Sequence, residues 1–189
     1  MPELAEVEFT RKRWNVGFGK EIEAVSIHSN ARIFRGCDIN ELKRKLVGAV
    51  LTYSESHGKQ MLFQFRGRGY LGIHLGMTGD LLVETERYKG GKHDHLVLKQ
   101  KRQMLVLNDP RLFGRVRFSP GSEIPDWWSM LPPRIDSQEF TPAVVRSFLK
   151  RRKGSPLKAI LLIQEAFPGI GNWMADEILW RARIHPARF

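Results

Sequence analysis

The chain has 189 residues, with 31 lysines and arginines against 20 aspartates and glutamates, so its formal net charge is +11. A hydrophobic fraction of 42% excludes wholesale disorder, and a single cysteine, Cys37, excludes a disulfide framework and a cysteine-based zinc finger within these residues. No apolar run approaches a membrane span and nothing N-terminal reads as a secretory signal, so we predict an intracellular protein, and the excess of basic residues favours a polyanionic partner.

Residues 2–17 form the first predicted element, a short amphipathic helix. Pro2 suits the first helical turn, where its missing N–H costs nothing. Glu3 and Glu6 suit the positive end of the helix dipole. The apolar residues recur at helical spacing among charged ones: Leu4, Val7 and Trp14.

From residue 21 to residue 118 the pattern changes to short runs rich in β-branched and aromatic residues. Turn signals separate many of the runs, and a helix is predicted at 40–47 after Asp38 as its cap. Many short strands with few helices between them predict an antiparallel sandwich or barrel. The predicted strands are 21–28, 49–56, 60–66, 70–75, 80–84, 95–100, 104–108 and 114–118.

The last third of the chain is predicted to be helical. A segment rich in proline and tryptophan, 119–141, is typical of a linker. Three helices follow, at 142–150 after Thr141, at 156–167 after Ser155 and at 172–183. A β-rich half and a helical half therefore predict two small domains.

Taken singly, the motifs with chemical potential each have an ordinary structural explanation. Pro2 beside two glutamates is typical of a capped helix start, and the loop HLGMTG at 74–79 is typical of a hairpin connection. The NDPRLFG run at 108–114 has turn chemistry, and PGIGN at 168–172 is a weak phosphate-binding signal at a helix start. His93 and His95 lack further spaced ligands, so structural hydrogen bonds are favoured over a metal.

The same motifs in this order are far more specific. The chain begins MPELAEVE, has a lysine at position 59, and continues with HLGMTG, KHDH, NDPRLFG and GIGNWMADEIL. Together they resemble the formamidopyrimidine-DNA glycosylase (Fpg/Nei) family over nearly the whole chain. The resemblance implies an α+β fold whose N-terminal antiparallel β-sandwich domain (1–120) carries an N-terminal helix. A linker (121–141) and a partial helix–two-turn–helix DNA-binding domain (142–189) would follow, with damaged double-stranded DNA between the domains.

The resemblance places the catalytic residues at the N-terminus. Removal of Met1 would leave Pro2 as a free secondary amine, the implied nucleophile, which attacks the deoxyribose C1′ to form a cationic Schiff base. Expulsion of the base and β,δ-elimination of the strand would follow. Glu3 is the implied proton donor, Glu6 an assisting carboxylate, and Lys59 a proton donor and phosphate contact.

A base that leaves the stack opens a gap in the duplex, and the resemblance implies which residues fill it. Met77, Arg111 and Phe113 match the filling residues, in an arrangement that looks like the oxidised-purine branch of the family rather than its pyrimidine-directed branch. Leu112 departs from the common Arg-Arg-Phe pattern, and we expect little catalytic consequence. Further DNA contacts are implied for His93, Lys158 and Asn172.

The family usually continues beyond the last residue of this sequence, with more helices, a loop over the flipped base and a zinc finger. We therefore expect a C-terminally truncated, monomeric form with no metal or other cofactor, in the cytoplasm or nucleoid of a bacterium or in the nucleus or an organelle of a eukaryote. Two functions stay open. One is a glycosylase/AP lyase for 8-oxoguanine and formamidopyrimidine; the other is a lyase-only or non-catalytic damaged-DNA-binding protein. An unstable remnant without a role is the third possibility.

Overall fold

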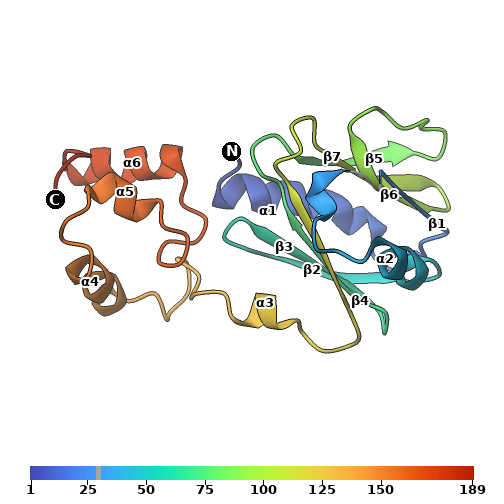
Figure 1. Ribbon diagram of the computed structural model, residues 1–189, viewed down its shortest axis with the longest axis horizontal. Helices are drawn as coiled ribbons and strands as arrows, with labels where there is room; N and C mark the ends of the chain where they lie inside the picture. The colour runs from blue at the N-terminus through green and yellow to red at the C-terminus, as the bar shows by residue number, and fades with distance from the viewer. Residues whose placement is uncertain (29–30) are drawn as a thin grey trace.

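Two four-stranded antiparallel sheets pack face to face in the N-terminal part of the computed structural model, which describes residues 1–28 and 31–189 (Figure 1). Leucine and phenylalanine side chains from both sheets form one buried core between them, which confirms the predicted sandwich. The first sheet has the order β1-β6-β7-β5, with β1 (Ala24–Ile27), β5 (Asp80–Thr85), β6 (Asp94–Gln100) and β7 (Gln103–Asn108). The second has the order β2-β3-β4-β8, with β2 (Leu51–His57), β3 (Gln60–Phe65), β4 (Gly69–His74) and β8 (Arg115–Pro120).

Helix α1 (Leu4–Arg13) and the 3₁₀ turn η1 (Trp14–Gly17) pack against strands of both sheets. The expectation of an amphipathic helix is wrong in one respect, because the buried face of α1 is largely polar. Arg11 is buried there and donates hydrogen bonds to the carbonyl oxygen of Ser54 (2.9 Å) and to its hydroxyl group. The aromatic ring of Trp14 supplies the apolar contact instead, fully buried against Phe63.

Glu8 completes this polar cluster. Its carboxylate accepts hydrogen bonds from Arg11 (2.7 Å) and from the hydroxyl group of Ser56 (2.7 Å), and these contacts lower the Glu8 pKa from 4.5 to about 2 although burial opposes the change. The folded-state pKa lies below the unfolded value. The carboxylate therefore stabilises the fold fully above about pH 4.5, and this contribution is lost as the pH falls towards 2.

We expect Glu8→Gln to lower the melting temperature at pH 7 by about 2–8 °C, since about 1–2 kcal/mol remains after allowance for the exposed part of the side chain. The variant should also show a flatter dependence of stability on pH between about 4.5 and 2. Thermal melts over that range, with the exposed Glu86→Gln as control, measure both effects. Identical pH profiles for Glu8→Gln and the parent protein would contradict the assignment.

Two shorter elements cover the sandwich, the 3₁₀ turn η2 (Arg32–Phe34) and helix α2 (Ile39–Leu46). Asp38 caps α2 as predicted, because its carboxylate accepts the backbone N–H of Glu41 (2.9 Å). The segment expected to be a linker contains a further helix, α3 (Asp126–Ser129), whose Trp128 packs on Leu62 and Tyr70. This part of the connection is therefore attached to the sandwich.

The C-terminal part consists of helices α4 (Pro142–Lys150), α5 (Leu157–Leu161) and α6 (Asn172–Ala182), which share a second apolar core. Thr141 caps α4 as predicted, with its hydroxyl group accepting from Val144 N–H (3.4 Å). The helix expected at 156–167 is wrong in length, because α5 ends at Leu161 and turns follow. Gln164 stabilises these turns by donating to the carbonyl oxygens of Leu162 and Ile170. Among the described helices, none is long and apolar enough to cross a membrane.

Candidate active site

Glu3 connects the start of α1 to the start of α6. Its carboxylate is 6% exposed and accepts the backbone N–H groups of Trp173 and Met174, both at 2.8 Å. Helix α6 has no capping side chain of its own, so a residue 170 positions away supplies the cap. The positive end of the α6 dipole further stabilises the carboxylate there.

The glycines before α6 allow this close approach. A Cβ atom on Gly171 would lie 2.3 Å from Oε1 of Glu3, and one on Gly169 would lie 2.9 Å from the Cβ of Leu4. Gly169 also has a φ of +95°, which disfavours any other residue, and its carbonyl oxygen accepts the Leu4 N–H (3.1 Å). The run that resembles a phosphate cradle in sequence therefore holds the N-terminus of the same chain.

Lys59 reaches the same junction from the turn between β2 and β3. Its amine donates to the carbonyl oxygen of Ile170 (2.8 Å), and the residue is 7% exposed. Burial lowers the Lys59 pKa, and the charge of Glu3 partly opposes this change. The lysine is therefore close enough to Glu3 for the two charges to interact.

A pocket of about 580 Å³ lies beside the N-terminus. Pro2 is half-buried next to it, and Glu6 accepts the backbone N–H of Glu3 (2.9 Å). The structure thus places four predicted catalytic residues (Pro2, Glu3, Glu6 and Lys59) at one junction between the sandwich and the helices, with Asn172 at the pocket wall. The lining residues are Met1, Glu3, Ala5, Glu6, Asn172, Trp173 and Met174.

The predicted gap-filling residues lie on two loops that are joined through Asp109. The fully buried carboxylate of Asp109 accepts the Thr78 hydroxyl group (3.1 Å) from one loop and the Gly114 N–H (2.7 Å) from the other. These loops expose Met77 (45%) and Phe113 (42%). We define the wedge loops as residues 74–79 and 109–114.

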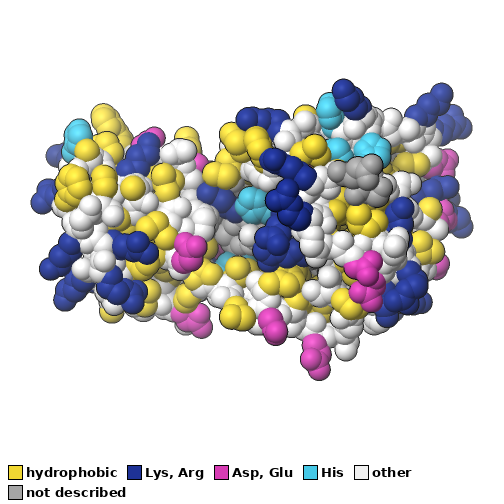
Figure 2. All heavy atoms as spheres, viewed as in Figure 1, with side chains coloured by type: hydrophobic (Ala, Val, Ile, Leu, Met, Phe, Trp, Pro, Cys, Tyr) yellow, Lys and Arg dark blue, Asp and Glu magenta, His cyan; other side chains and the backbone are white. Residues whose placement is uncertain are grey.

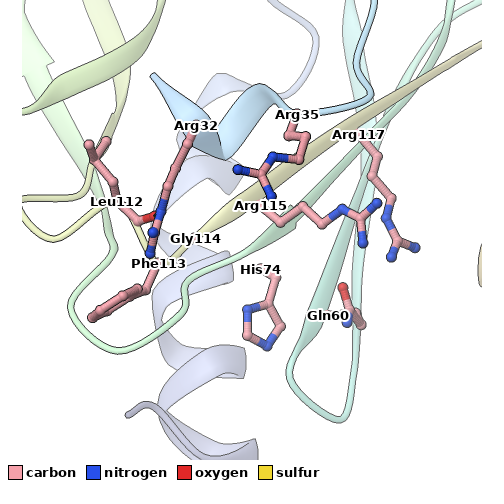
Figure 3. A pocket seen from close by; sticks show the side chains of 9 residues that line it. All are labelled: Arg32, Arg35, Gln60, His74, Leu112, Phe113, Gly114, Arg115 and Arg117. Atoms are coloured by element: carbon pink, nitrogen blue, oxygen red, sulfur yellow. The ribbon is translucent and has the colours of Figure 1, made fainter. Parts of the chain in front are cut away.

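Backbone contact between the wedge loops is equally close. A Cβ atom on Gly76 would lie 2.3 Å from the carbonyl carbon of Phe113, and Gly76 has a φ of +65°. Two guanidinium groups lie over the ring of Phe113, that of Arg32 at 4.8 Å and that of Arg111 at 4.9 Å from its centre. Figure 3 shows the Arg32 side chain running along this loop. Leu112 adopts a left-handed conformation (φ 57°), and Arg32 donates to its carbonyl oxygen (2.7 Å).

The two remaining predicted DNA contacts are Lys158 and His93, and His93 adjoins the second wedge loop through its backbone. Lys158 forms an ion pair with Asp176 (2.7 Å) on the outer side of α6. His93 precedes β6, and its carbonyl oxygen accepts the backbone N–H of Asp109 (3.0 Å). Both assignments stay predictions.

Sequence reasoning missed Asp109 and Gly171, which position the predicted residues. The turn chemistry of Asn-Asp-Pro was the one local signal for Asp109. Gly171 belongs to the PGIGN run, but that run indicated a phosphate and not Glu3, which is remote in sequence. Residues 1–28 and 31–189 contain no group of three or more histidines, cysteines or carboxylates that could hold a metal ion.

Family models cover both parts of the chain. The formamidopyrimidine-DNA glycosylase N-terminal domain matches residues 1–116, and the formamidopyrimidine-DNA glycosylase H2TH domain matches residues 131–189. The chain belongs to the formamidopyrimidine-DNA glycosylase family.

Individual members of the formamidopyrimidine-DNA glycosylase family are similar over the full length of this chain. The formamidopyrimidine-DNA glycosylase of Solibacter usitatus is 38% identical over 98% of this chain and 67% of its own length. That of Thermus thermophilus is 34% identical over 100% of this chain and 67% of its own length.

A solved structure of Lactococcus lactis formamidopyrimidine-DNA glycosylase, bound non-covalently to DNA containing an AP site, superimposes with a TM-score of 0.86. It is 28% identical and covers 98% of this chain and 72% of that chain. A second structure of the Lactococcus lactis protein, in complex with DNA containing N7-benzyl-Fapy-dG, gives a TM-score of 0.82 at 27% identity and covers 99% of this chain and 70% of that chain.

Proposed function

We propose that this chain is a DNA glycosylase and AP lyase that removes oxidised purines, 8-oxoguanine and formamidopyrimidine, from double-stranded DNA. The observation that carries the proposal is the position of Pro2. Once Met1 is removed, the nitrogen of Pro2 begins the chain next to the buried Glu3, beside a pocket whose wall includes Met1, Glu3 and Glu6. A secondary amine and a carboxylate in one pocket are the two groups that Schiff-base chemistry on a sugar needs.

In the proposed reaction the amine of Pro2 attacks the C1′ of the damaged nucleotide. The bond from C1′ to the base breaks, and the base leaves with the bonding electron pair and with the proton that the Pro2 nitrogen loses after it bonds to C1′. Glu3 donates a proton to the sugar ring oxygen as the ring opens, and the nitrogen lone pair forms a cationic iminium with C1′. Loss of a C2′ proton expels the 3′ phosphate, and a second elimination expels the 5′ phosphate.

The remaining predicted residues bind and hold the DNA. Lys59 contacts the phosphate beside the lesion and supplies protons, while the side chain of Asn172 at the start of α6 binds a neighbouring phosphate. Met77, Arg111 and Phe113 fill the gap left by the flipped nucleotide. His93 and Lys158 add DNA contacts, for which Lys158 must exchange its ion pair with Asp176 for a phosphate.

Three further features belong to the proposal. The steps above use only side chains and the N-terminal amine, so we propose no cofactor. The relatives in complex with AP-site and Fapy-dG DNA support a damaged duplex as the partner. We also propose that the protein acts inside the cell as a monomer.

The test is covalent trapping with borohydride, which reduces an iminium to a stable amine. The Met-processed protein is incubated with a labelled duplex that contains an abasic site and with one that contains 8-oxoguanine opposite cytosine. We expect covalent adducts with both duplexes and, when borohydride is left out, cleavage of the damaged strand of each duplex at the damaged position.

Two results would contradict parts of the proposal. An adduct with the abasic duplex alone would mean that the lyase step occurs without excision of the oxidised purine. Folded protein that forms no adduct with either duplex would favour the non-catalytic DNA-binding function, and a melting curve recorded on the same sample establishes that it is folded.

A further inference from the structure

A second pocket, of about 490 Å³, lies on the sandwich beside the wedge loops (Figure 3). Arg32 and Arg35 enter it from the η2 region, and Arg115 and Arg117 enter it from β8. His74 lies at its centre in the close-up. We call it the arginine pocket; its other lining residues are Gln60, Leu112, Phe113 and Gly114.

The charge of the arginine pocket is not balanced from within the protein. Among the ion pairs of the described residues, none involves these four arginines. Burial and the neighbouring Arg115 lower the Arg117 pKa, and His74 is affected in the same direction by burial, Lys59 and Arg117. In Figure 2, Lys and Arg side chains gather in the middle of this face, next to a recessed histidine. Like charges held together in a hollow favour an anionic ligand.

Aromatic rings position two of the guanidinium groups. Arg32 lies over Phe113, and Arg117 lies over Trp127 at 5.2 Å from the ring centre. A guanidinium that stacks through its face keeps its N–H edges available for hydrogen bonds. Planar guanidinium edges match phosphate oxygens, so Arg117 and the two terminal nitrogens of Arg32, whose Nε donates to Leu112, are suited to phosphate.

His74 adds a neutral donor to this set. Its Nδ1 accepts the backbone N–H of Gly76 (3.0 Å), so the ring proton belongs on Nε2. The lowered pKa keeps the ring uncharged near neutral pH. The pocket therefore combines four permanent positive charges with a neutral N–H donor, all next to the exposed ring of Phe113.

We propose that the arginine pocket is an additional phosphate-binding site, which holds consecutive backbone phosphates of duplex DNA beside the wedge loops. This inference rests on the proposed function, from which it takes duplex DNA as the partner. The contacts it adds are separate from those of Lys59 and the start of α6. Four guanidinium groups exceed the charge of one phosphodiester, so the site takes more than one phosphate. Because these residues contact backbone and not bases, they add affinity without distinguishing damaged from undamaged DNA.

The test measures duplex affinity for the double variant Arg115→Gln, Arg117→Gln over a range of salt concentrations. We expect affinity to fall about tenfold at 0.1 M salt, and the slope of log affinity against log salt to decrease by about 1–2, since each lost phosphate contact releases about one counterion fewer. Undamaged and abasic duplexes should lose affinity by the same factor. Arg68→Gln is the matched control, because Arg68 is exposed at the opposite end of β3 from Gln60.

Two further variants keep the test decisive. Arg115→Gln alone leaves the contact between Arg117 and Trp127 in place and should reduce the salt slope by about 1. Arg115→Lys with Arg117→Lys keeps the charge and should restore most of the slope. Folded Gln variants whose affinity and slope equal those of Arg68→Gln would overturn the proposal. Borohydride trapping at saturating DNA tests the proposed glycosylase and lyase chemistry, which does not depend on the arginine pocket. The two proposals can therefore fail independently of each other.

Discussion

Replacing Pro2 by glycine is expected to reduce borohydride trapping on abasic DNA by on the order of 10²-fold or more, equivalent to about 2.7 kcal/mol in the barrier. A secondary amine forms an iminium that is permanently cationic. The primary amine of glycine forms an imine that becomes neutral when its nitrogen loses a proton, and a neutral imine withdraws electrons less strongly. The flexible glycine also no longer holds the amine in one orientation beside Glu3. Affinity for an undamaged duplex should stay within about threefold, because the variant keeps an N-terminal amine and loses no side-chain charge.

A second form of the same chain provides the control for this prediction. Protein that retains Met1 has the nitrogen of Pro2 in a peptide bond, where it has no nucleophilic lone pair, and it should form no adduct at all. Quantified adduct on a denaturing gel compares the three proteins. Equal trapping by the Met1-retaining form would show that another amine is the nucleophile, and the α-amine of Met1, which lines the pocket, and then Lys59 would be the groups to examine.

Replacing Glu3 by glutamine is expected to lower the rate of strand cleavage by about 10²–10⁴-fold, the usual contribution of a positioned general acid or base. Glutamine has the same shape but cannot carry the proton. Its carbonyl oxygen still accepts one of the α6 backbone N–H groups, so we expect the melting temperature to fall by only about 2–4 °C, or about 1 kcal/mol. Single-turnover cleavage of an abasic duplex measures the rate.

Gly171→Ala separates the chemical role of Glu3 from its role as a cap. The added methyl group would lie 2.3 Å from Oε1 of Glu3, so it displaces the carboxylate but leaves its proton-carrying group in the protein. We expect this variant to lose as much stability as Glu3→Gln or more, and to keep more of the cleavage rate. If the two variants lose rate in proportion to their loss of stability, Glu3 acts only through the junction.

The antiparallel sandwich could be predicted because its strands are short, rich in β-branched and aromatic residues, and in many cases separated by turn residues. All eight predicted strands occur, and their ends differ from prediction by three residues or fewer. Helix α4 has the predicted bounds because its signals are local, with Thr141 and Pro142 at its start. The bounds of such elements depend on residues inside or next to the element, and these residues can be read from the sequence.

Contacts between distant segments could not be predicted in the same way. The buried face of α1 is polar because Arg11 forms hydrogen bonds with Ser54, 43 residues away. The helical spacing of residues does not predict that partner. Helix α5 is shorter than predicted, and beyond its end the side chain of Gln164 stabilises turns by donating to the carbonyl oxygens of Leu162 and Ile170, contacts that the sequence pattern does not indicate. The arginine pocket draws side chains from four separate segments, so none of its arginines stands out in the sequence.

The site residues fall into the same two groups. Those carried by motifs, such as Pro2 and Phe113, could be named from the resemblance before any geometry was known. The groups that hold them, Asp109 and the glycines before α6, became evident only in three dimensions. Positioning residues are set by their neighbours in space, and a single sequence does not show those neighbours.

The single carboxylate of Asp109 has an energetic consequence for the wedge loops. Thr78 and Gly114 donate to the two oxygens of one buried group, and Gly76 touches the backbone of Phe113, so neither loop moves without displacing the other. Substitutions in the two loops should therefore be non-additive, in contrast to changes at well-separated sites. In a duplex, entry of Met77 and Phe113 would be a single concerted movement with one barrier, and a defect in either loop would slow both.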